Sequence, residues 1–261
     1  MLEIILFLAI ALLILLFFYK QSVEEYKLNQ ISFSQAAALP ALMAEKSPIV
    51  VLDTPQIPFW NSADLASRPF LATAPLANGM AIGNAIHLNV EEFKPHRLYN
   101  KNQADLLGEK TGAPVWVQNK WTSHIVPKFL HWASLPVCSA WFGSRGLQST
   151  TAPWTLLTVS EGTAQVSLLH KKYDTFLPRS WKGRLPTEFT AADTPFLGDI
   201  GYIDVILRPG TTLLVPAHWK VSWCSVPASS SEEAEKPHQV FMLETAFHHP
   251  LSRLVEKFQE R

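Results

Sequence analysis

The sequence predicts a mainly β domain of the sandwich or barrel class, with flanking helices and a single N-terminal transmembrane helix. From Pro114 onward, short apolar runs alternate with turn residues about every ten positions, which is typical of sandwiches and barrels. Two of these runs flank the pair Pro209-Gly210, so we predict a strand, a tight turn and a strand there. Both runs are largely apolar, which favours a place in the core for this predicted hairpin. The first residues form a separate apolar segment.

That N-terminal segment spans residues 1–20. Between Ile4 and Tyr19 it carries no charged side chain, and its length approaches the ~20 residues that cross a bilayer. No basic region precedes it and no small-residue cleavage site follows it, which favours an anchor over a signal peptide or a buried core helix. Lys20 and Lys27 follow the segment, and no Lys or Arg precedes it. We therefore predict a single-pass membrane protein with its N-terminus out and its C-terminal domain in the cytosol.

Residues 21–46 are predicted to form a juxtamembrane stalk and residues 47–261 one domain. A short helix is expected at 34–39, another between 118 and 135, and an amphipathic C-terminal helix at 247–261, where Leu251, Leu254, Val255 and Phe258 share one face. The predicted strands are 48–52, 81–88, 115–118, 138–142, 154–159, 164–169, 202–207, 212–215, 221–224 and 240–245. Residues 226–237 are expected to form a solvated loop.

Composition excludes some classes of function. The formal net charge is zero and no cluster of Lys and Arg stands out, so we expect no nucleic-acid partner. Nine tryptophans are expected mainly to pack the core, with an aromatic ligand platform as the alternative. Cys138 and Cys224 are predicted to be free thiols, although a bridge between them stays open.

Three segments resemble the cupin-like, JmjC-type oxygenases. They are Trp141-Phe142-Gly143, the run from Thr155 to Gly162, and the run from Leu207 to Trp219 with its Pro-Gly and Pro-x-x-Trp signature. This resemblance implies a double-stranded β-helix, also called a jelly roll or cupin fold. It also implies Fe(II), held by two histidines and a carboxylate, and 2-oxoglutarate as co-substrate.

The residues that this family uses for chemistry are replaced. Its first two iron ligands are spaced His-x-Asp or His-x-Glu, and none of the nine histidines has that spacing. The aligned stretch here is Gln148–Pro153, and the second histidine aligns near Lys220 or Val221. The family's basic residue for 2-oxoglutarate aligns with Ala164, and its asparagine with Thr155. The resemblance therefore implies a retained scaffold without the metal chemistry.

A metal site rebuilt around His218 would need nearby histidines and a carboxylate, for which the candidates are His170, His248, His249, Asp199 and Asp204. There is no Gly-x-Ser-x-Gly elbow, no phosphate-cradling glycine loop and no Cys-x-x-Cys pair. Basic residues in Ser144-Arg145-Gly146 and in Trp181–Arg184 are interpreted as solvated loop charges, with an anion site as the alternative.

We therefore expect no catalytic residue, no metal ligand and no cofactor. The preferred hypothesis is a membrane-anchored, non-catalytic module that binds a protein or small-molecule partner. Its candidate ligand contacts are Thr155, His218, Trp219 and Lys220. One alternative is an oxygenase that uses Fe(II) and 2-oxoglutarate with displaced ligands. The other is a structural jelly-roll protein that acts by self-association.

Overall fold

The computed structural model describes residues 27–75, 80–85, 101–128, 131, 134–226 and 240–248. The predicted transmembrane segment, nearly all of the predicted 226–237 loop and the predicted C-terminal helix beyond His248 lie outside these ranges. Among the described helices, none combines the length and the apolar character that a membrane crossing requires.

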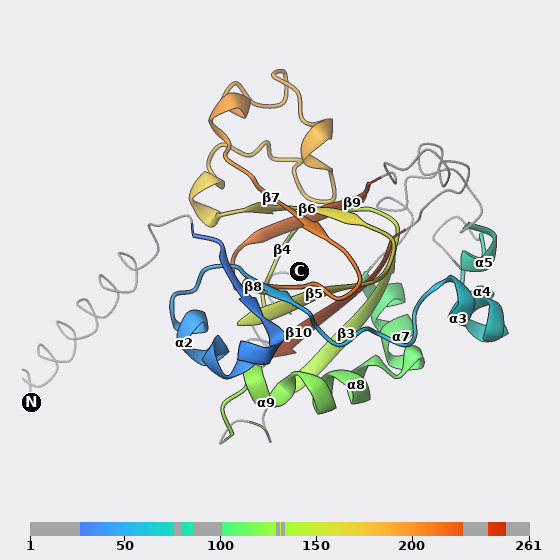
Figure 1. Cartoon of the computed structure of the whole chain (residues 1–261). Helices are drawn as coiled ribbons and strands as arrows, with labels where there is room; N and C mark the ends of the chain where they lie inside the picture. Colours follow the sequence, from blue (N-terminus) through green and yellow to red (C-terminus); the bar gives the residue numbers. More distant parts are fainter. Residues whose placement is uncertain are drawn as a thin grey trace, which may run out of the picture.

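Two sheets face each other and form the body of the domain (Figure 1). The larger sheet contains, in spatial order, β1 (Asn29–Ser32), β2 (Ile49–Leu52), β8 (Thr212–Pro216), β5 (Trp154–Glu161), β10 (Phe241–His248) and β3 (Leu135–Phe142). The smaller sheet contains β4 (Arg145–Ser149), β9 (Lys220–Ser225), β6 (Ala164–Leu169) and β7 (Ile203–Leu207). All pairs are antiparallel except β1 with β2.

From β3 to β10 the chain passes repeatedly between the two sheets. The order β3-β10-β5-β8 in one sheet and β4-β9-β6-β7 in the other is the strand order of a jelly roll, or double-stranded β-helix. The prediction of a mainly β, cupin-like fold with flanking helices is confirmed at this level. The interior between the sheets is closed by apolar side chains, and Trp141 of β3 meets Trp223 of β9 edge-on at 5.9 Å between ring centroids.

The predicted hairpin around Pro209-Gly210 is wrong in its pairing, although both strands and the turn exist. Thr211 N donates to Arg208 O at 2.9 Å, and Gly210 has a φ of 87°, which suits glycine. However, β7 pairs with β6, whereas β8 pairs with β2 and β5. The turn therefore connects β7 in the smaller sheet to β8 in the larger sheet. Both strands bury apolar side chains, as predicted, but they do not pair with each other.

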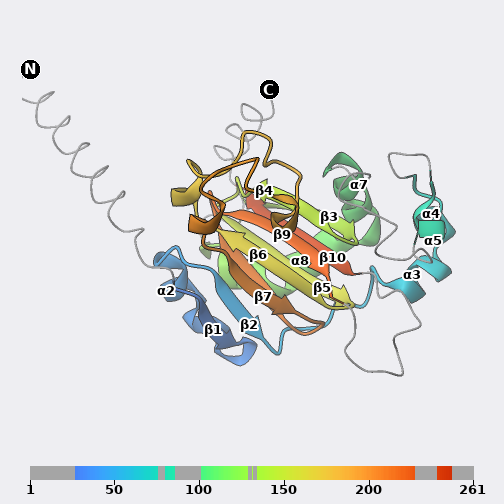
Figure 2. The same cartoon turned by 90° about the horizontal axis from the view of Figure 1, so that it is seen from above.

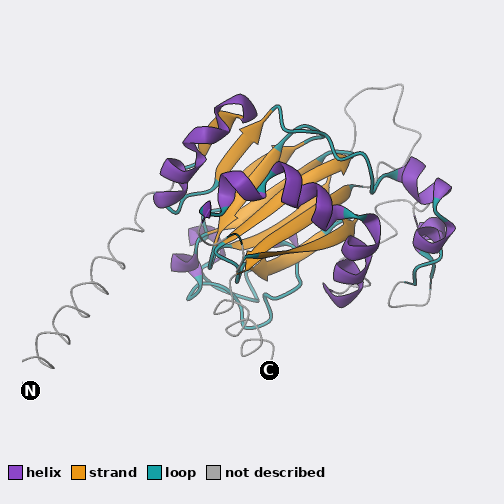
Figure 3. Cartoon of the chain, turned by 90° about the horizontal axis from the view of Figure 1, so that it is seen from below, coloured by secondary structure: helices purple, strands orange, loops and turns teal. Residues whose placement is uncertain are grey.

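Helices cover the face of the larger sheet that points away from the smaller one (Figure 3). These are η1 (Phe33–Ala38), α2 (Leu39–Ala44), α7 (Lys101–Thr111), α8 (Ala113–Lys120) and α9 (Thr122–Ile125). Helix α7 packs closely on β3, since a Cβ on Gly108 would lie 1.9 Å from the carbonyl oxygen of Cys138. Three short helices, α3 (Ser62–Ser67), α4 (Pro69–Ala72) and α5 (Ile82–Ala85), lie together beside the sheets (Figure 1).

Two predicted strands are helices instead. Residues 115–118 lie in α8, which follows Gly112 with its φ of 84° and has Pro114 in its first turn. Proline in the first helical turn loses no hydrogen bond, so this segment carries a helix start signal that outweighs its β-branched residues. Residues 82–85 form α5, and Ala81 makes only an isolated bridge to Pro75. Short apolar runs do not distinguish strand from helix by period alone.

The N-terminal part of the described chain also joins the domain. β1 pairs in register with β2, and Ala36 and Leu39 contribute buried side chains to the main core. These elements lie in the range predicted as a stalk. Lys27 and Asn29 both contact the carboxylate of Glu45, which ties the start of β1 to the end of α2.

A long insertion between β6 and β7, residues 170–202, lies over one end of the outer face of the smaller sheet (Figure 2). It contains η3 (Lys171–Tyr173), η4 (Pro186–Glu188) and η5 (Leu197–Asp199). A second small core forms beneath it from Leu147, Leu169, Leu177, Phe189 and Ile200.

Candidate functional site

The positions that the resemblance aligns with iron ligands do lie side by side. β4 pairs with β9 so that Gln148 faces Val221 and Ser149 faces Lys220. An amide, an isopropyl group, a hydroxyl and an ammonium group stand where iron would need imidazoles and a carboxylate. Val221 is buried in the main core. The residues present therefore do not fit the Fe(II) site that the resemblance implies.

Thr150, in the same aligned stretch, has a structural role. Its hydroxyl contacts the carbonyl oxygens of Pro216 at 2.8 Å and Trp219 at 3.0 Å. In addition, His218 N donates to Thr150 O at 2.8 Å. These bonds clamp the β8–β9 turn to the loop between β4 and β5.

Further along the barrel interior lies a buried ion pair. Arg145 of β4 donates to the carboxylate of Glu244 on β10, and Trp141 Nε1 donates to the same carboxylate at 2.7 Å. The guanidinium carbon lies 4.1 Å from the ring centroid of Trp141 and 5.1 Å from that of Trp223. The interpretation of Arg145 as a solvated loop charge is wrong, because the residue lies in a strand and is only 8% exposed.

The other two aligned positions also face buried surroundings. Thr155 lies on β5, paired with Ala246 and Val215, and is 2% exposed. Ala164 begins β6 and is completely buried. Thr155 belongs to the larger sheet, so the structure does not group it with the other three candidate ligand contacts.

His218, Trp219 and Lys220 lie together at the β8–β9 turn. His218 has a left-handed φ of 69°, a conformation that a residue other than glycine rarely adopts. Trp219 packs edge-on against His170 of the insertion, with ring centroids 4.9 Å apart. Lys220 is 4% exposed, donates to Asp174, and lies 5.0 Å from the ring centroid of Trp181. This cluster fastens the insertion to the sheet.

Burial and neighbouring cations lower the pKa values of His218 and of His170, which packs against this turn. For His170, burial lowers the pKa most, followed by Lys172 and Lys171, and Asp174 opposes them. For His218, burial again lowers the pKa most, followed by Lys171, while Asp174 raises it. Both imidazoles are therefore harder to protonate than an ordinary histidine.

Of the described residues considered for a rebuilt metal site, His170 and His218 lie near the same turn, and the others do not complete a metal site with them. His248 ends β10, and Asp204 on β7 accepts a hydrogen bond from Ser167 at 2.6 Å. Asp199 lies in η5, and His249 is outside the described residues. Over the described ranges there is no group of three or more His, Cys, Asp or Glu side chains that would hold a metal ion.

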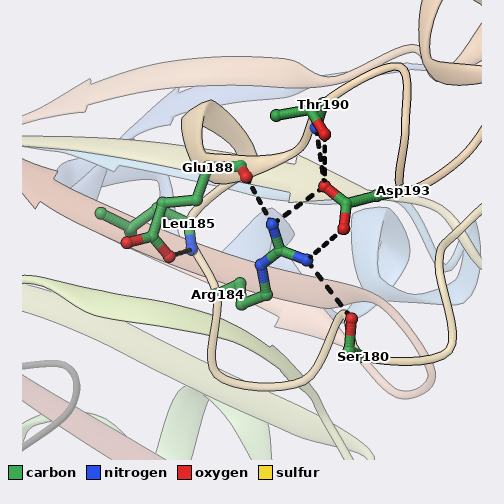
Figure 4. Close-up of polar contacts among 6 residues, drawn as sticks. All are labelled: Ser180, Arg184, Leu185, Glu188, Thr190 and Asp193. Atoms are coloured by element: carbon green, nitrogen blue, oxygen red, sulfur yellow. Dashed lines mark hydrogen bonds and ion pairs between the residues drawn. The ribbon is translucent and has the colours of Figure 1, made fainter.

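A network within the insertion holds its loops together (Figure 4). Arg184 makes a two-pronged contact with Asp193, with both N–O distances at 3.0 Å, and Thr190 donates to the same carboxylate from its backbone and its hydroxyl. The hydrogen bond from Arg184 lowers the pKa of Asp193 far below its ordinary value. Arg184 is a partly exposed loop residue, as predicted, and it is paired with Asp193.

An apolar cavity of about 320 Å³ lies outside the barrel, where α2 and the end of α9 meet the larger sheet. Its walls include Met43 of α2, Val126 after α9, Trp154 of β5 and Phe247 of β10. Sequence reasoning missed it, since its walls come from four distant segments with no local motif. Both cysteines are free, as predicted, but Cys224 is only half-buried.

No protein-family model matches the sequence, and no curated protein is significantly similar to it. Among solved structures, hydroquinone 1,2-dioxygenase from Sphingomonas sp. TTNP3 with bound 4-hydroxybenzoate is 13% identical, with a TM-score of 0.29 over 46% of this chain and 62% of that one. Hydroxypropylphosphonic acid epoxidase from S. wedmorenis is 11% identical, with a TM-score of 0.26 over 44% of each chain. The chain thus matches less than two thirds of either structure's length, and the fold assignment rests on the strand order.

Proposed function

We propose that this chain is a membrane-anchored binding or scaffold module that keeps the jelly roll of the cupin-like, JmjC-type oxygenases and does not use their Fe(II)/2-oxoglutarate chemistry. The observation that carries the proposal is the pairing of β4 with β9. Because Gln148 lies directly opposite Val221, the two strands have the relationship that the family alignment requires. This pairing supports the view that the missing ligands are substitutions.

The contents of the barrel support the same function. Trp141 and Trp223 fill the space between the sheets, and the ion pair of Arg145 and Glu244 lies against both rings. Side chains packed this closely occupy the space that a ligand would need, so the interior serves to hold the outer surfaces in place. Binding is therefore assigned to surfaces outside the barrel.

The anchor is the second part of the proposal. The apolar residues 1–20 would span the bilayer, and Lys20 and Lys27 would keep the domain in the cytosol. The free thiols Cys138 and Cys224 support a reducing compartment. Alkaline extraction of cell membranes tests the anchor, since an anchored chain stays in the membrane pellet, and its release into the supernatant would contradict this part.

The chemical part is tested with the full chain in lipid nanodiscs. We expect no stoichiometric Fe(II) binding and no succinate formation from 2-oxoglutarate. A matched variant that restores the ligand set, Gln148→His with Thr150→Asp and Val221→His, should gain measurable Fe(II) affinity if the two strands have the proposed relationship. Stoichiometric iron that supports 2-oxoglutarate decarboxylation in the unmodified chain, abolished by His218→Ala, would establish the displaced-ligand alternative instead.

A further inference from the structure

The apolar cavity between α2 and the larger sheet has the properties of a small-molecule site. Its volume of about 320 Å³ lies at the lower end of the ~300–1,000 Å³ range of ligand pockets. The apolar wall includes Met43 of α2, Val126 after α9, Trp154 of β5 and Phe247 of β10. Helix and strand residues in the wall favour a preformed pocket over a transient gap.

Size restricts the occupant. An apolar cavity of ~150 Å³ accepts benzene. The cavity here has about twice that volume, which suits a molecule about twice the size of benzene.

The wall also restricts the polar character of the occupant. Ser134 contributes a hydroxyl and His248 an imidazole, and both residues are buried. Among the described residues that line the cavity, none is Lys, Arg, Asp or Glu. A charged head group would lose its hydration without gaining an opposite charge, whereas a single hydroxyl would find a hydrogen-bonding partner.

We propose that this cavity binds an uncharged, single-chain apolar molecule that carries one hydroxyl group, of the size of a ten-carbon aliphatic alcohol. The apolar chain lies against Met43, Trp154 and Phe247, and the hydroxyl exchanges a hydrogen bond with Ser134. This inference rests on the proposed binding role and supplies its ligand class.

The test uses the full chain in nanodiscs and a ten-carbon alcohol bearing a photoreactive diazirine, with the labelled residues located by mass spectrometry. We expect saturable labelling of the cavity wall, displaced by unlabelled 1-decanol and at least several-fold less well by decanoate or decane. Met43→Trp, which fills the cavity, should abolish labelling at the wall. Val115→Trp, on the exposed side of α8, should leave it unchanged.

A second variant covers the case in which Met43→Trp fails to fold. Ser134→Ala should weaken competition by 1-decanol several-fold while leaving competition by decane unchanged. Two results would overturn the inference. One is labelling that does not saturate. The other is equal displacement by 1-decanol and decane in both the unmodified chain and Ser134→Ala. Succinate formation measured in the same preparation tests the proposed function separately, so absent labelling without turnover refutes only the ligand assignment.

Discussion

Arg145 and Glu244 form an ion pair inside the barrel, with Trp141 and Trp223 packed against the guanidinium group. Removal of one partner leaves a buried charge without compensation, whereas replacement of both by apolar residues removes the desolvation cost as well. We expect Glu244→Leu to lower the free energy of unfolding by about 3–5 kcal/mol. The double variant Arg145→Met/Glu244→Leu should lose much less, as measured by urea unfolding. Equal losses in the single and double variants would show that the pair is not coupled.

Gly108 is required where α7 contacts β3. Alanine normally favours a helix, but here its Cβ would meet the backbone of Cys138, which has no room to move. We expect Gly108→Ala to cost about 1–3 kcal/mol of unfolding free energy. Gly198→Ala is the matched control, since no heavy atom lies within 4 Å of its added Cβ. A neutral Gly108→Ala would mean that α7 does not pack on β3 as described.

Because Arg184 contacts Asp193, the stability of the insertion's loops against local unfolding should depend on pH. Because the pKa of Asp193 is lowered in the folded state, its contribution is complete above the ordinary aspartate pKa of about 3.9 and is lost as the pH falls further. Asp193→Asn should remove this contribution at every pH. Hydrogen exchange of the backbone amides in residues 180–193 measures both effects. Unchanged protection in Asp193→Asn would contradict a role for this contact.

His170 and His218 should titrate below the ordinary histidine pKa of about 6.5. Since the folded state disfavours their protonated form, their contribution to stability is complete above that pH and is lost as the pH falls toward the folded-state pKa. Lys171→Gln removes a cation near both rings and should raise both pKa values. NMR titration of the imidazole protons measures this, and Lys110→Gln on α7 serves as the control. A shift in only one histidine would show that the two do not share this neighbour.

The fold was predictable wherever the apolar pattern coincided with clear turn residues. β5, β6, β8 and β9 follow this rule, and their predicted bounds differ from the observed ones by at most two residues. β4 was missed because Gly146 interrupts it and its side chains have little β preference. Gly146 is needed there, since a Cβ would lie 2.0 Å from the carbonyl oxygen of Gly183 in the insertion.

The site was less predictable than the fold. The family resemblance implied that the aligned ligand positions are substituted, and Gln148 and Val221 of that alignment do lie opposite each other. It did not reveal that Arg145 finds its partner 99 positions away in Glu244, because a contact between distant strands leaves no local pattern. The cavity depends in the same way on how distant segments meet.

β1 lies at the edge of the larger sheet, parallel to β2, with four residue pairs in register. A pull on Lys27 along the strand axis would load these four pairs together in shear, and the contacts of Glu45 with Lys27 and Asn29 would share that load. These pairs would have to separate together and not one after another under such a pull.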